Sequence, residues 1–526
     1  MTQVNETRAV ASRRILAGLS GLLAAAVSLT AAELAAAAVR PEAGPVVAVG
    51  GSAVDRTPAA VKDWAIRTFG EADKLVLQLG ILGVLALCAV ALGLLALRHR
   101  RAGAAGVLVF GAVGAAAALS RPDSASWTDA LPSVAGALAG AAVLHVLAGR
   151  LTAPPADTPD TGAGWDRRGF LIAASAAAAA SAGAGVAARV AAGARGGDAA
   201  ASRDAVGLPR PASPAAAIPS GAALRVPGLQ PFTTPNKDFY RVDTALVVPK
   251  VDAGAWRLRI HGTGVRTPLI LTFRDLLERA LVERDITLNC VSNEVGGPYV
   301  GNARWIGVPL APLLREAGVR PPSRGGRADQ LVSRSVDGMT IGTPVEDVMD
   351  GRDALLAVGM NGEPLPFDHG FPVRMVVPGL YGYVSACKWI EDIELTSFDA
   401  YDAYWVKRDW AREAPVKTQS RIDTPKPFAR PGAGTVMVAG VAWAQHRGID
   451  AVEVRVDDGP WRRAELAAEH TADTWRQWSF AWKATPGSHT LTVRATDRTG
   501  TTQTEKRTRT VPDGASGWHS VVVTVE

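Results

Sequence analysis

The chain has 526 residues, of which 48% are hydrophobic and 20% are charged, and its formal net charge is +6. This length exceeds what one hydrophobic core usually serves, so we expect several folded units. The basic excess lies mainly beside apolar runs, and no block of Lys and Arg alternates with aromatic residues, so we expect no nucleic-acid partner. The three cysteines have no regular spacing and predict neither a disulfide framework nor a zinc site.

The first 151 residues contain apolar runs that are long enough to cross a bilayer, which takes about 20 residues. These runs are 15–39, 75–97, 102–120 and 131–149. Glu33 lies in the first run, where a carboxylate is tolerable near the end of a span. The alternative is a set of buried helices in a soluble protein, but four successive runs are hard to bury that way. We therefore predict a four-helix transmembrane region over 1–151.

The segment 165–190 starts with Arg167-Arg168-Gly-Phe-Leu and continues as a run of small apolar residues. It resembles a twin-arginine export signal. Because the segment is internal, it can also serve as a fifth transmembrane helix. A simpler alternative is a basic pair that flanks a helix on the cytoplasmic side.

Arginine clusters precede or join the apolar runs and predict their orientation. They consist of Arg8, Arg13 and Arg14, then Arg98, Arg100 and Arg101, and then Arg150, Arg167 and Arg168. All three fall on one side of the bilayer if the N-terminus is cytoplasmic. We therefore expect a multi-pass protein of the cell membrane whose part after residue 195 is extracytoplasmic. His145 is the one histidine inside a run, so we expect an anchor or a docking surface for a redox partner and no bis-histidine haem.

The second half of the chain has the composition of an ordinary globular protein. Residues 195–225 are rich in Ala, Pro, Gly and Ser and predict a disordered linker. Strand and helix patterns then alternate over 228–412, with Thr272 as a helix N-cap, and this alternation predicts an α+β domain. Strand-like runs without helical periodicity fill 428–526 and predict a β-sandwich.

Cys290 ends the short apolar run ITLNC and precedes a polar, glycine-rich stretch. A cysteine thiolate is a nucleophile or a metal ligand. The plainest alternative is a buried cysteine that packs as a small hydrophobic residue. A third alternative is a cysteine-nucleophile hydrolase, which needs a nearby base, and His369 is the candidate for that base.

Four segments around and after this cysteine carry a longer pattern. They are TPNKDFY with the following Arg241, CVSNEVGGPYVGNARWIGVPL from Cys290, MNGEPLPFDHGFPVRMVVPGLYGYVSACKWIEDIEL from Met360, and YWVKRDW from Tyr404. In this order they resemble the catalytic domain of the sulfite oxidase family. The C-terminal β-sandwich is similar to the immunoglobulin-like domain of that family. The resemblance implies an oxidoreductase with a Mo-molybdopterin cofactor, in which the thiolate of Cys290 ligates molybdenum and a small-molecule substrate undergoes two-electron oxygen-atom transfer.

The resemblance also implies which residues contact the cofactor. They are Asn236, Tyr240, Arg241, Thr343, His369, Arg374, Ser385, Ala386, Cys387 and Lys388. Arg374 and Lys388 suit an anionic phosphate, the first through a bidentate fork and the second as a point charge. Arg241 and Arg408 are further catalytic candidates for contact with substrate or cofactor. Each residue taken singly also has an ordinary structural interpretation, such as a salt bridge or a turn.

The chain departs from the family pattern where sulfite would bind. Sulfite-oxidising members follow the cysteine with arginines, whereas here the residues after Cys290 are Val-Ser-Asn-Glu-Val. Glu294 would repel an anion unless its side chain points away. A tyrosine common before the Met-Asn-Gly turn is also missing. The substrate therefore stays open between a small oxyanion and an S- or N-oxide.

The sequence carries no Cys-x-x-Cys-His haem motif. We therefore expect electrons to pass to or from a separate electron-transfer protein or a quinone-linked partner. The competing hypothesis is a non-catalytic, membrane-anchored binding protein that retains the fold. The resemblance leaves a homodimer open.

Overall fold

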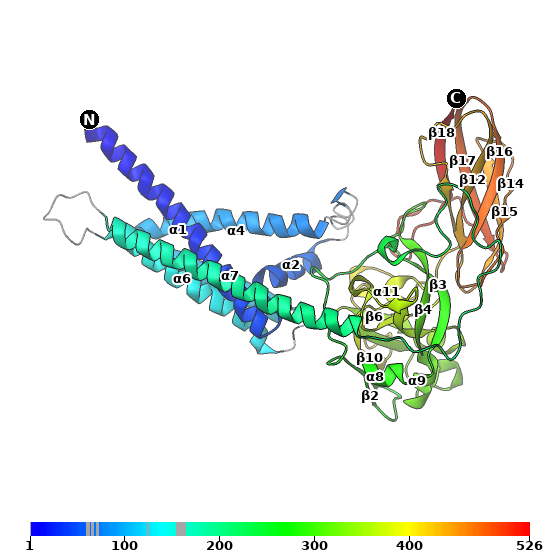
Figure 1. Ribbon diagram of the computed structural model, residues 1–526, viewed down its shortest axis with the longest axis horizontal. Helices are drawn as coiled ribbons and strands as arrows, with labels where there is room; N and C mark the ends of the chain where they lie inside the picture. Colours follow the sequence, from blue (N-terminus) through cyan, green and yellow to red (C-terminus); the bar gives the residue numbers. More distant parts are fainter. Residues whose placement is uncertain are drawn as a thin grey trace. The chain divides into compact units, whose positions relative to one another are not determined.

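The chain divides into two compact units in a computed structural model that describes residues 2–58, 61, 64, 68–69, 73–121, 124, 126–153 and 165–526. The first unit comprises Met1–Asp198 with Ala245–Val248, and the second comprises Ala199–Thr244 with Pro249–Glu526. In Figure 1 the first unit consists of the blue and teal helices, and the second contains the green to red strands.

The first unit is helical, as the apolar runs predict. Its helices are α1 (Thr2–Ala38), α2 (Pro45–Arg56), α4 (Asp73–Arg98), α5 (Arg100–Leu119), α6 (Leu131–Thr152) and most of α7 (Arg167–Asp204), with the 3-10 turns η1 (Pro41–Ala43) and η3 (Trp127–Ala130). Among the described residues, five helices have the length and apolar composition to cross a membrane. They correspond to the four predicted runs and to the predicted segment 165–190. Helix α2 was not predicted.

Helix α2 lies between the first two predicted runs, in the stretch from Arg40 to Lys74. Residues 59–60, 62–63, 65–67 and 70–72 of that stretch lie outside the described residues. Pro45 occupies the first turn of α2, where a missing amide hydrogen costs nothing because that group has no partner inside the helix.

Helix α1 packs closely on two neighbours through small residues. A Cβ atom added at Gly93 of α4 would collide with the backbone oxygen of Ala17 in α1, and one at Gly21 of α1 would collide with the backbone oxygen of Ala89. A Cβ atom added at Gly140 of α6 would lie 2.9 Å from the carbonyl oxygen of Ala24. Glycine at these positions lets the helix backbones touch, which is the usual way that helices associate in lipid.

The expected disordered linker at 195–225 is wrong in this structure. Helix α7 continues to Asp204. After Asp204 the backbone forms hydrogen bonds with other parts of the second unit. The amide of Ala212 donates to the carbonyl of Leu281 at 2.8 Å, and the amide of Leu224 donates to Oε1 of Gln477 at 2.6 Å. Composition alone does not reveal such external partners.

The part of the second unit predicted as α+β contains two five-stranded sheets. One has the order β2-β1-β10-β5-β6, with β2 (Leu269–Thr272), β1 (Arg257–Gly262), β10 (Ile390–Thr396), β5 (Gln330–Ser335) and β6 (Thr340–Pro344). The other has the order β3-β4-β7-β8, with β9 paired to β7; its strands are β3 (Val282–Asn289), β4 (Val300–Pro309), β7 (Leu355–Met360), β8 (Glu363–Pro364) and β9 (Arg374–Val376). Strands β1 and β10 run parallel, and β3, β4 and β7 run antiparallel.

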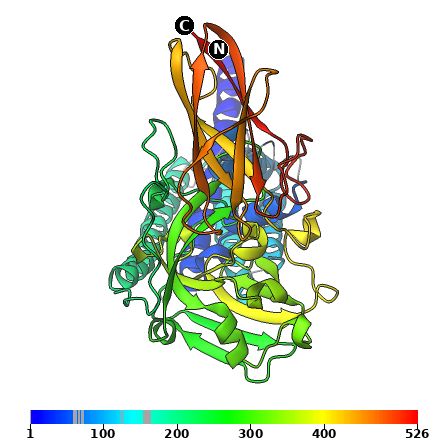
Figure 2. The ribbon, with the colours of Figure 1, turned by 90° about the vertical axis from the view of Figure 1, so that its right-hand side faces the viewer.

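Short helices accompany these sheets (Figure 2). They are α8 (Phe273–Leu277), α9 (Leu310–Glu316), α10 (Val345–Met349) and α11 (Gly382–Ser385). Thr272 caps α8 as predicted: its hydroxyl accepts from the amide of Asp275, and the Asp275 carboxylate accepts from the amide of Thr272. Gly318, with φ of +87°, follows the end of α9 in the left-handed conformation that glycine allows.

The C-terminal region is rich in β-strands, as predicted. Its two four-stranded sheets have the orders β11-β12-β16-β15 and β14-β13-β17-β18. The strands are β11 (Gln419–Thr424), β12 (Gly434–Trp443), β13 (Ile449–Val456), β14 (Arg462–Arg463), β15 (Glu465–Leu466), β16 (Arg476–Ala484), β17 (Gly487–Asp497) and β18 (His519–Val525). Residues such as Trp478 and Val493 from the two sheets share one core. The finer immunoglobulin-like assignment stays a prediction.

Candidate functional site

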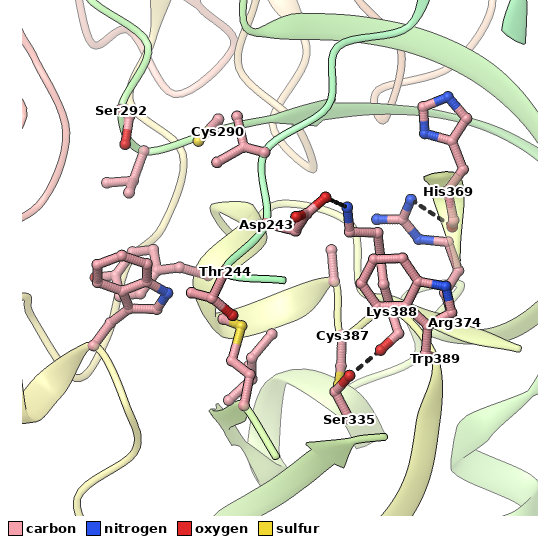
Figure 3. A pocket seen from close by; sticks show the side chains of 18 of the residues that line it. Asp243, Thr244, Cys290, Ser292, Ser335, His369, Arg374, Cys387, Lys388 and Trp389 are labelled. Atoms are coloured by element: carbon pink, nitrogen blue, oxygen red, sulfur yellow. Dashed lines mark hydrogen bonds and ion pairs between the residues drawn. The ribbon is translucent and has the colours of Figure 1, made fainter. Parts of the chain in front are cut away.

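A pocket lies beside the C-terminal end of β3, at Cys290 (Figure 3). It encloses about 860 Å³ of space, part of which is open to solvent. The lining comes from segments that are far apart in the sequence, namely 239–244, 290–292, 335–341, 369–389 and two tryptophans at 405 and 410. The fold of the second unit therefore brings the predicted cysteine to a cavity.

Most of the predicted site residues line this pocket. They are Tyr240, Cys290, His369, Arg374, Ala386, Cys387 and Lys388. Glu294 is exposed and lies outside the lining, so its carboxylate does point away, as the sequence allowed. Trp305 is fully buried in the core.

Three predicted cofactor residues lie just behind the pocket wall. Asn236 donates from its amide to Oε1 of Glu363 at 2.5 Å. Thr343 and Ser385 are fully buried; the hydroxyl of Thr343 donates to the carbonyl of Val384, and that of Ser385 donates to the carbonyl of Leu380. The hydroxyls of Thr343 and Ser385 thus support α11, whereas Asn236 is bonded to β8.

Arg241 and Arg408, the two cations predicted to contact substrate or cofactor, are absent from the lining. Nε of Arg241 lies 2.9 Å from Oδ2 of Asp243, and its Nη1 lies 3.1 Å from Oδ1 of Asp368. The guanidinium of Arg408 lies 3.6 Å from the ring centroid of Tyr404 and donates to the carbonyl of that residue. The structure therefore does not bring either arginine to the pocket surface, because each binds neighbouring groups instead.

Two cations lie buried in one wall of the pocket. Nζ of Lys388 is 2.7 Å from Oδ2 of Asp243, yet burial lowers the pKa of Lys388 to about 8. Arg374 donates from Nη1 to the carbonyl of His369 at 3.2 Å, and burial lowers the pKa of Arg374 to about 10. Nε of Arg374 is buried and has no hydrogen-bond partner among the described residues. This wall would therefore be stabilised by a bound anion.

His369 is a neutral ring in this wall. Burial, followed by the nearby charge of Arg374, lowers the pKa of His369 to about 4. Its Nε2 lies 3.0 Å from the carbonyl oxygen of Asn236. Because a carbonyl only accepts, Nε2 carries the proton and Nδ1 is left as an acceptor.

The thiol of Cys290 is also shaped by its surroundings. Burial raises the pKa of Cys290, and hydrogen bonds from the amide and the hydroxyl of Ser292 act in the opposite direction. Among the described residues, no hydrogen bond joins His369 to Cys290, and His369 is held by Asn236. This arrangement does not favour the cysteine-nucleophile hydrolase.

Several lining residues were missed by sequence reasoning, among them Asp243, Thr244, Ser292, Trp405 and Trp410. Trp405 and Trp410 lie in the segment YWVKRDW, from which only Arg408 was selected. Asp243 lies two residues after Arg241, which follows the first matched segment. These residues lie in or beside the segments that carry the family resemblance, but we selected only the arginines there as candidates for substrate contact.

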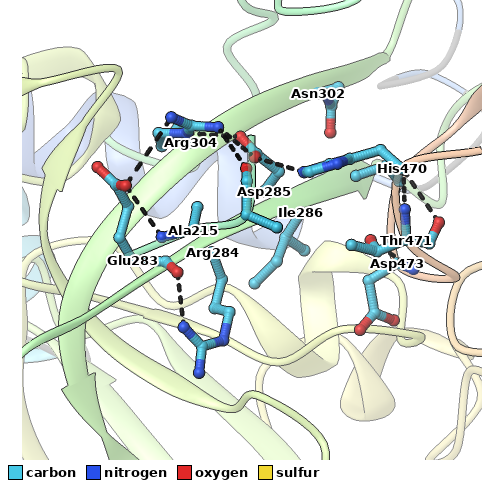
Figure 4. A network of polar contacts seen from close by, with 12 residues as sticks. Ala215, Glu283, Arg284, Asp285, Ile286, Asn302, Arg304, His470, Thr471 and Asp473 are labelled. Carbon is cyan, nitrogen blue, oxygen red and sulfur yellow. Dashed lines mark hydrogen bonds and ion pairs between the residues drawn. The ribbon is translucent and has the colours of Figure 1, made fainter. Parts of the chain in front are cut away.

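Strand β3, which delivers Cys290, is held by a buried polar network (Figure 4). The carboxylate of Asp285 accepts from Nε and Nη2 of Arg304 at 3.1 and 2.7 Å, and lies 2.8 Å from Nε2 of His470. Two residues further along, Thr287 donates its amide to the carbonyl of Asp473 at 2.9 Å. His470 and Asp473 belong to the C-terminal region, so that region fixes the strand before the cysteine.

The loop after Cys290 has a similar support. Nη1 of Arg421 donates to the carbonyl of Gly297 at 2.8 Å, and Oδ1 of Asn293 accepts from the amide of Tyr299 at the same distance. A Cβ atom at Gly296 would collide with the ring of His519. The cysteine therefore lies between two anchored stretches of backbone.

Comparisons with known proteins agree with this geometry. The model of the oxidoreductase molybdopterin binding domain family matches residues 245–405. The chain is 32% identical over 290 residues to mitochondrial sulfite oxidase of Mus musculus, covering 47% of this chain and 53% of that protein. It is 32% identical over 296 residues to sulfite oxidase of Gallus gallus, covering 48% of this chain and 63% of that protein. The chain thus spans about half the length of these curated relatives.

A shorter relative is matched over most of its length. The chain is 31% identical over 186 residues to the uncharacterized oxidoreductase YuiH of Bacillus subtilis (strain 168), covering 35% of this chain and 86% of that protein. Among solved structures, the sulfane dehydrogenase SoxCD from Paracoccus pantotrophus is similar with a TM-score of 0.48 and 26% identity, covering 56% of this chain and 83% of that one. The chain belongs to the sulfite oxidase-like family of molybdopterin-dependent oxidoreductases, enzymes whose cofactor is Mo-molybdopterin.

Proposed function

We propose that this enzyme is anchored in the cell membrane and carries out two-electron oxygen-atom transfer on a small-molecule substrate, with Cys290 as the protein ligand of molybdenum. The observation that carries the proposal is that the loop residue Cys290 and two buried cations line one pocket. A thiolate suits the metal, and cations suit the phosphate of the cofactor.

The residues of the pocket fit this cofactor. Nε of Arg374 has no hydrogen-bond partner among the described residues, and burial lowers the pKa of Lys388, so additional negative charge would stabilise both cations. Among the described residues, no group of three or more His, Cys, Asp or Glu side chains could hold a metal by itself. That arrangement suits a metal that is chelated mainly by its cofactor and takes one ligand from the protein.

The chain's own groups then have distinct tasks. When bound, the molybdenum cofactor supplies the two-electron redox chemistry. Arg374 and Lys388 would hold its anionic groups, and neutral His369, fixed through Nε2, would offer Nδ1 as a hydrogen-bond acceptor. Cys387 also lines the pocket, and burial raises the pKa of its thiol to about 12.

Five long apolar helices and the arginine clusters beside them support a multi-pass location in the membrane. With the N-terminus in the cytoplasm, the catalytic domain is extracytoplasmic, and the segment 165–190 acts as a twin-arginine-like signal or as a fifth transmembrane helix. Electrons would be exchanged with a separate electron-transfer protein or a quinone-linked partner.

The first test is elemental and pterin analysis of the detergent-solubilised chain, produced in a host that makes the cofactor. We expect near-stoichiometric molybdenum and pterin in the wild type. Cys290→Ala should abolish turnover and change the paramagnetic signature of molybdenum even where pterin is retained. Cys88→Ala, which removes the cysteine of α4, is the matched control and should change neither property. Wild-type protein without molybdenum or pterin would favour the non-catalytic binding protein instead.

A further inference from the structure

The helical unit contains a larger cavity than the one at Cys290. It encloses about 1690 Å³ of space, part of which is open at its rim, and its lining comes from α1, α2, α4, α5 and α6. On α4 the lining extends from Val76 to Leu92, which is about 24 Å of helix at about 1.5 Å per residue. The cavity is therefore an elongated slot within the unit that we propose to cross the membrane.

The lining of this slot is apolar and uncharged. Among the described residues that form it, none is Asp, Glu, Lys, Arg or His, and the polar side chains are those of Ser28, Cys88 and Ser133. A phospholipid phosphate needs cations or water around it, and this lining supplies no cation. The slot therefore suits a long apolar chain that carries an uncharged head group.

A buried hydroxyl lies at one end of the slot. Ser133 is 3% exposed, and its Oγ has no hydrogen-bond partner among the described residues. A Cβ atom added at Gly114 would lie 2.8 Å from this Oγ and 3.5 Å from Cβ of Pro45, whereas one added at Gly106 would collide with the side chain of Leu92. Ser133 and Pro45 thus mark one end of the slot, and Leu92 marks the other. A buried hydroxyl of this kind is stabilised when an acceptor reaches it.

The first turn of α2 lies at the same end as Ser133. Pro45 and Val46 line the slot, and the N-cap residue Gly44 makes no side-chain hydrogen bond to this turn. The first amides of a helix have no partner within the helix, and the partial positive charge there favours an acceptor oxygen. Ser133 and α2 therefore offer hydrogen-bond donors at one end of an otherwise apolar slot.

We propose that the slot binds an isoprenoid quinone. One carbonyl oxygen of the head would accept from the hydroxyl of Ser133 and from the first turn of α2, and the apolar chain would lie along α4. The head is uncharged and carries only acceptor oxygens, so it needs donors and no cation. The inference rests on the proposed membrane location and names the carrier for the proposed electron exchange. A quinone takes up two electrons and two protons to become a quinol, which matches a two-electron reaction.

The test is photolabelling of the full chain in nanodiscs of phosphatidylcholine, with an azido-benzoquinone that carries a decyl chain as the probe. Mass spectrometry locates and quantifies the labelled peptides. We expect the label on α2, α4 and α6 around the slot, and competition by ubiquinone-2, whose head has the same acceptor oxygens. Dodecylbenzene and phosphatidylglycerol, which have apolar chains but no quinone head, should not compete.

Two variants of α4 form a matched pair. Gly80 lines the slot and Gly83 does not, and a Cβ atom added at either meets nothing within 4 Å. Gly80→Phe should fill the slot and reduce labelling of its lining about tenfold or more, whereas Gly83→Phe should leave the labelling unchanged. Ser133→Ala should weaken the competition by ubiquinone-2 about fivefold to tenfold, because it removes one donor. This small substitution carries the test if Gly80→Phe does not fold.

Several outcomes would overturn the inference. They are equal labelling of folded Gly80→Phe and Gly83→Phe, equal competition by ubiquinone-2 and dodecylbenzene, unchanged competition in Ser133→Ala, and label spread evenly over all the apolar helices. Failure of the proposed function has a separate signature, because the same preparation would then lack molybdenum and pterin whatever the probe labels.

Discussion

The two units of this chain differ in the contacts that stabilise each of them internally. In the helical unit, backbones meet at small residues such as Gly21 and Gly93. In the second unit, large side chains such as Trp305 and Trp475 are fully buried, and a charged network surrounds Asp285. Helices in lipid gain little from burying apolar surface and instead need close approach, whereas a domain in water is driven by apolar burial. Close backbone approach suits the proposed membrane anchor, and burial of large apolar side chains suits the catalytic domain.

The largest expected effect comes from the charged network of the second unit. Asp285→Ala removes the shared partner of Arg304 and His470, and the side chain of His470 is only 2% exposed. We expect a loss of about 3–5 kcal/mol in the free energy of unfolding, because partly buried charge and a buried ring lose their acceptor. Denaturant unfolding of the purified chain measures this loss.

Asp353→Ala is the matched control for that experiment. Asp353 pairs with Arg284, the neighbour of Asp285 on β3, but its side chain is 44% exposed. Its loss should cost less than about 1 kcal/mol, because solvent screens an exposed pair. Equal losses in the two variants would show that burial does not set the strength of this network.

A smaller effect is expected at the helix crossing of the first unit. Gly93→Val places a side chain against the backbone oxygen of Ala17 and should destabilise the unit by about 1–3 kcal/mol through overpacking. Thermal unfolding of the full chain in detergent tests this expectation. Gly83→Val, in the same helix, is the control, since a Cβ atom there meets nothing within 4 Å. If both variants behave alike, close backbone contact does not stabilise this unit.

The smallest effect concerns pH and the cofactor wall. Burial lowers the pKa of His369 from 6.5 to about 4. The folded chain therefore binds fewer protons here than the unfolded chain, and stability that is complete above pH 6.5 is lost as the pH falls toward 4. Between pH 7 and 5 the wild type should lose on the order of 1–2 kcal/mol more than His369→Gln, as measured by denaturant unfolding.

His489 provides a control of opposite sign. Its hydrogen bond with Asp457 raises the pKa of His489, so the stability it contributes is present below pH 6.5 and is lost at higher pH. His489→Gln should therefore remove stability at pH 5 more than at pH 8. A His369 variant that follows the same pattern would contradict the assignment of His369 as a buried neutral ring.

Local chemistry explains which features were predictable from sequence. The cap at Thr272 and the cysteine at the end of β3 depend on neighbours in the chain, and sequence patterns report such neighbours. The partner of Ala212, by contrast, is the carbonyl of Leu281, and Val242 and Trp405 line the same pocket. These associations depend on tertiary packing across long separations, for which no local spacing gives a signal.

The hydrogen bonds between the C-terminal region and β3 have a consequence for how the molecule unfolds. The carbonyl of Thr287 accepts from Nε2 of Gln445, and its amide donates to the carbonyl of Asp473. A chain cut after residue 427 would leave both backbone groups of Thr287 without these partners, next to a buried carboxylate at Asp285 that has lost His470. The two domains that the sequence predicts should therefore melt in one cooperative transition, and damage to the C-terminal region should first increase the mobility of the backbone around Cys290.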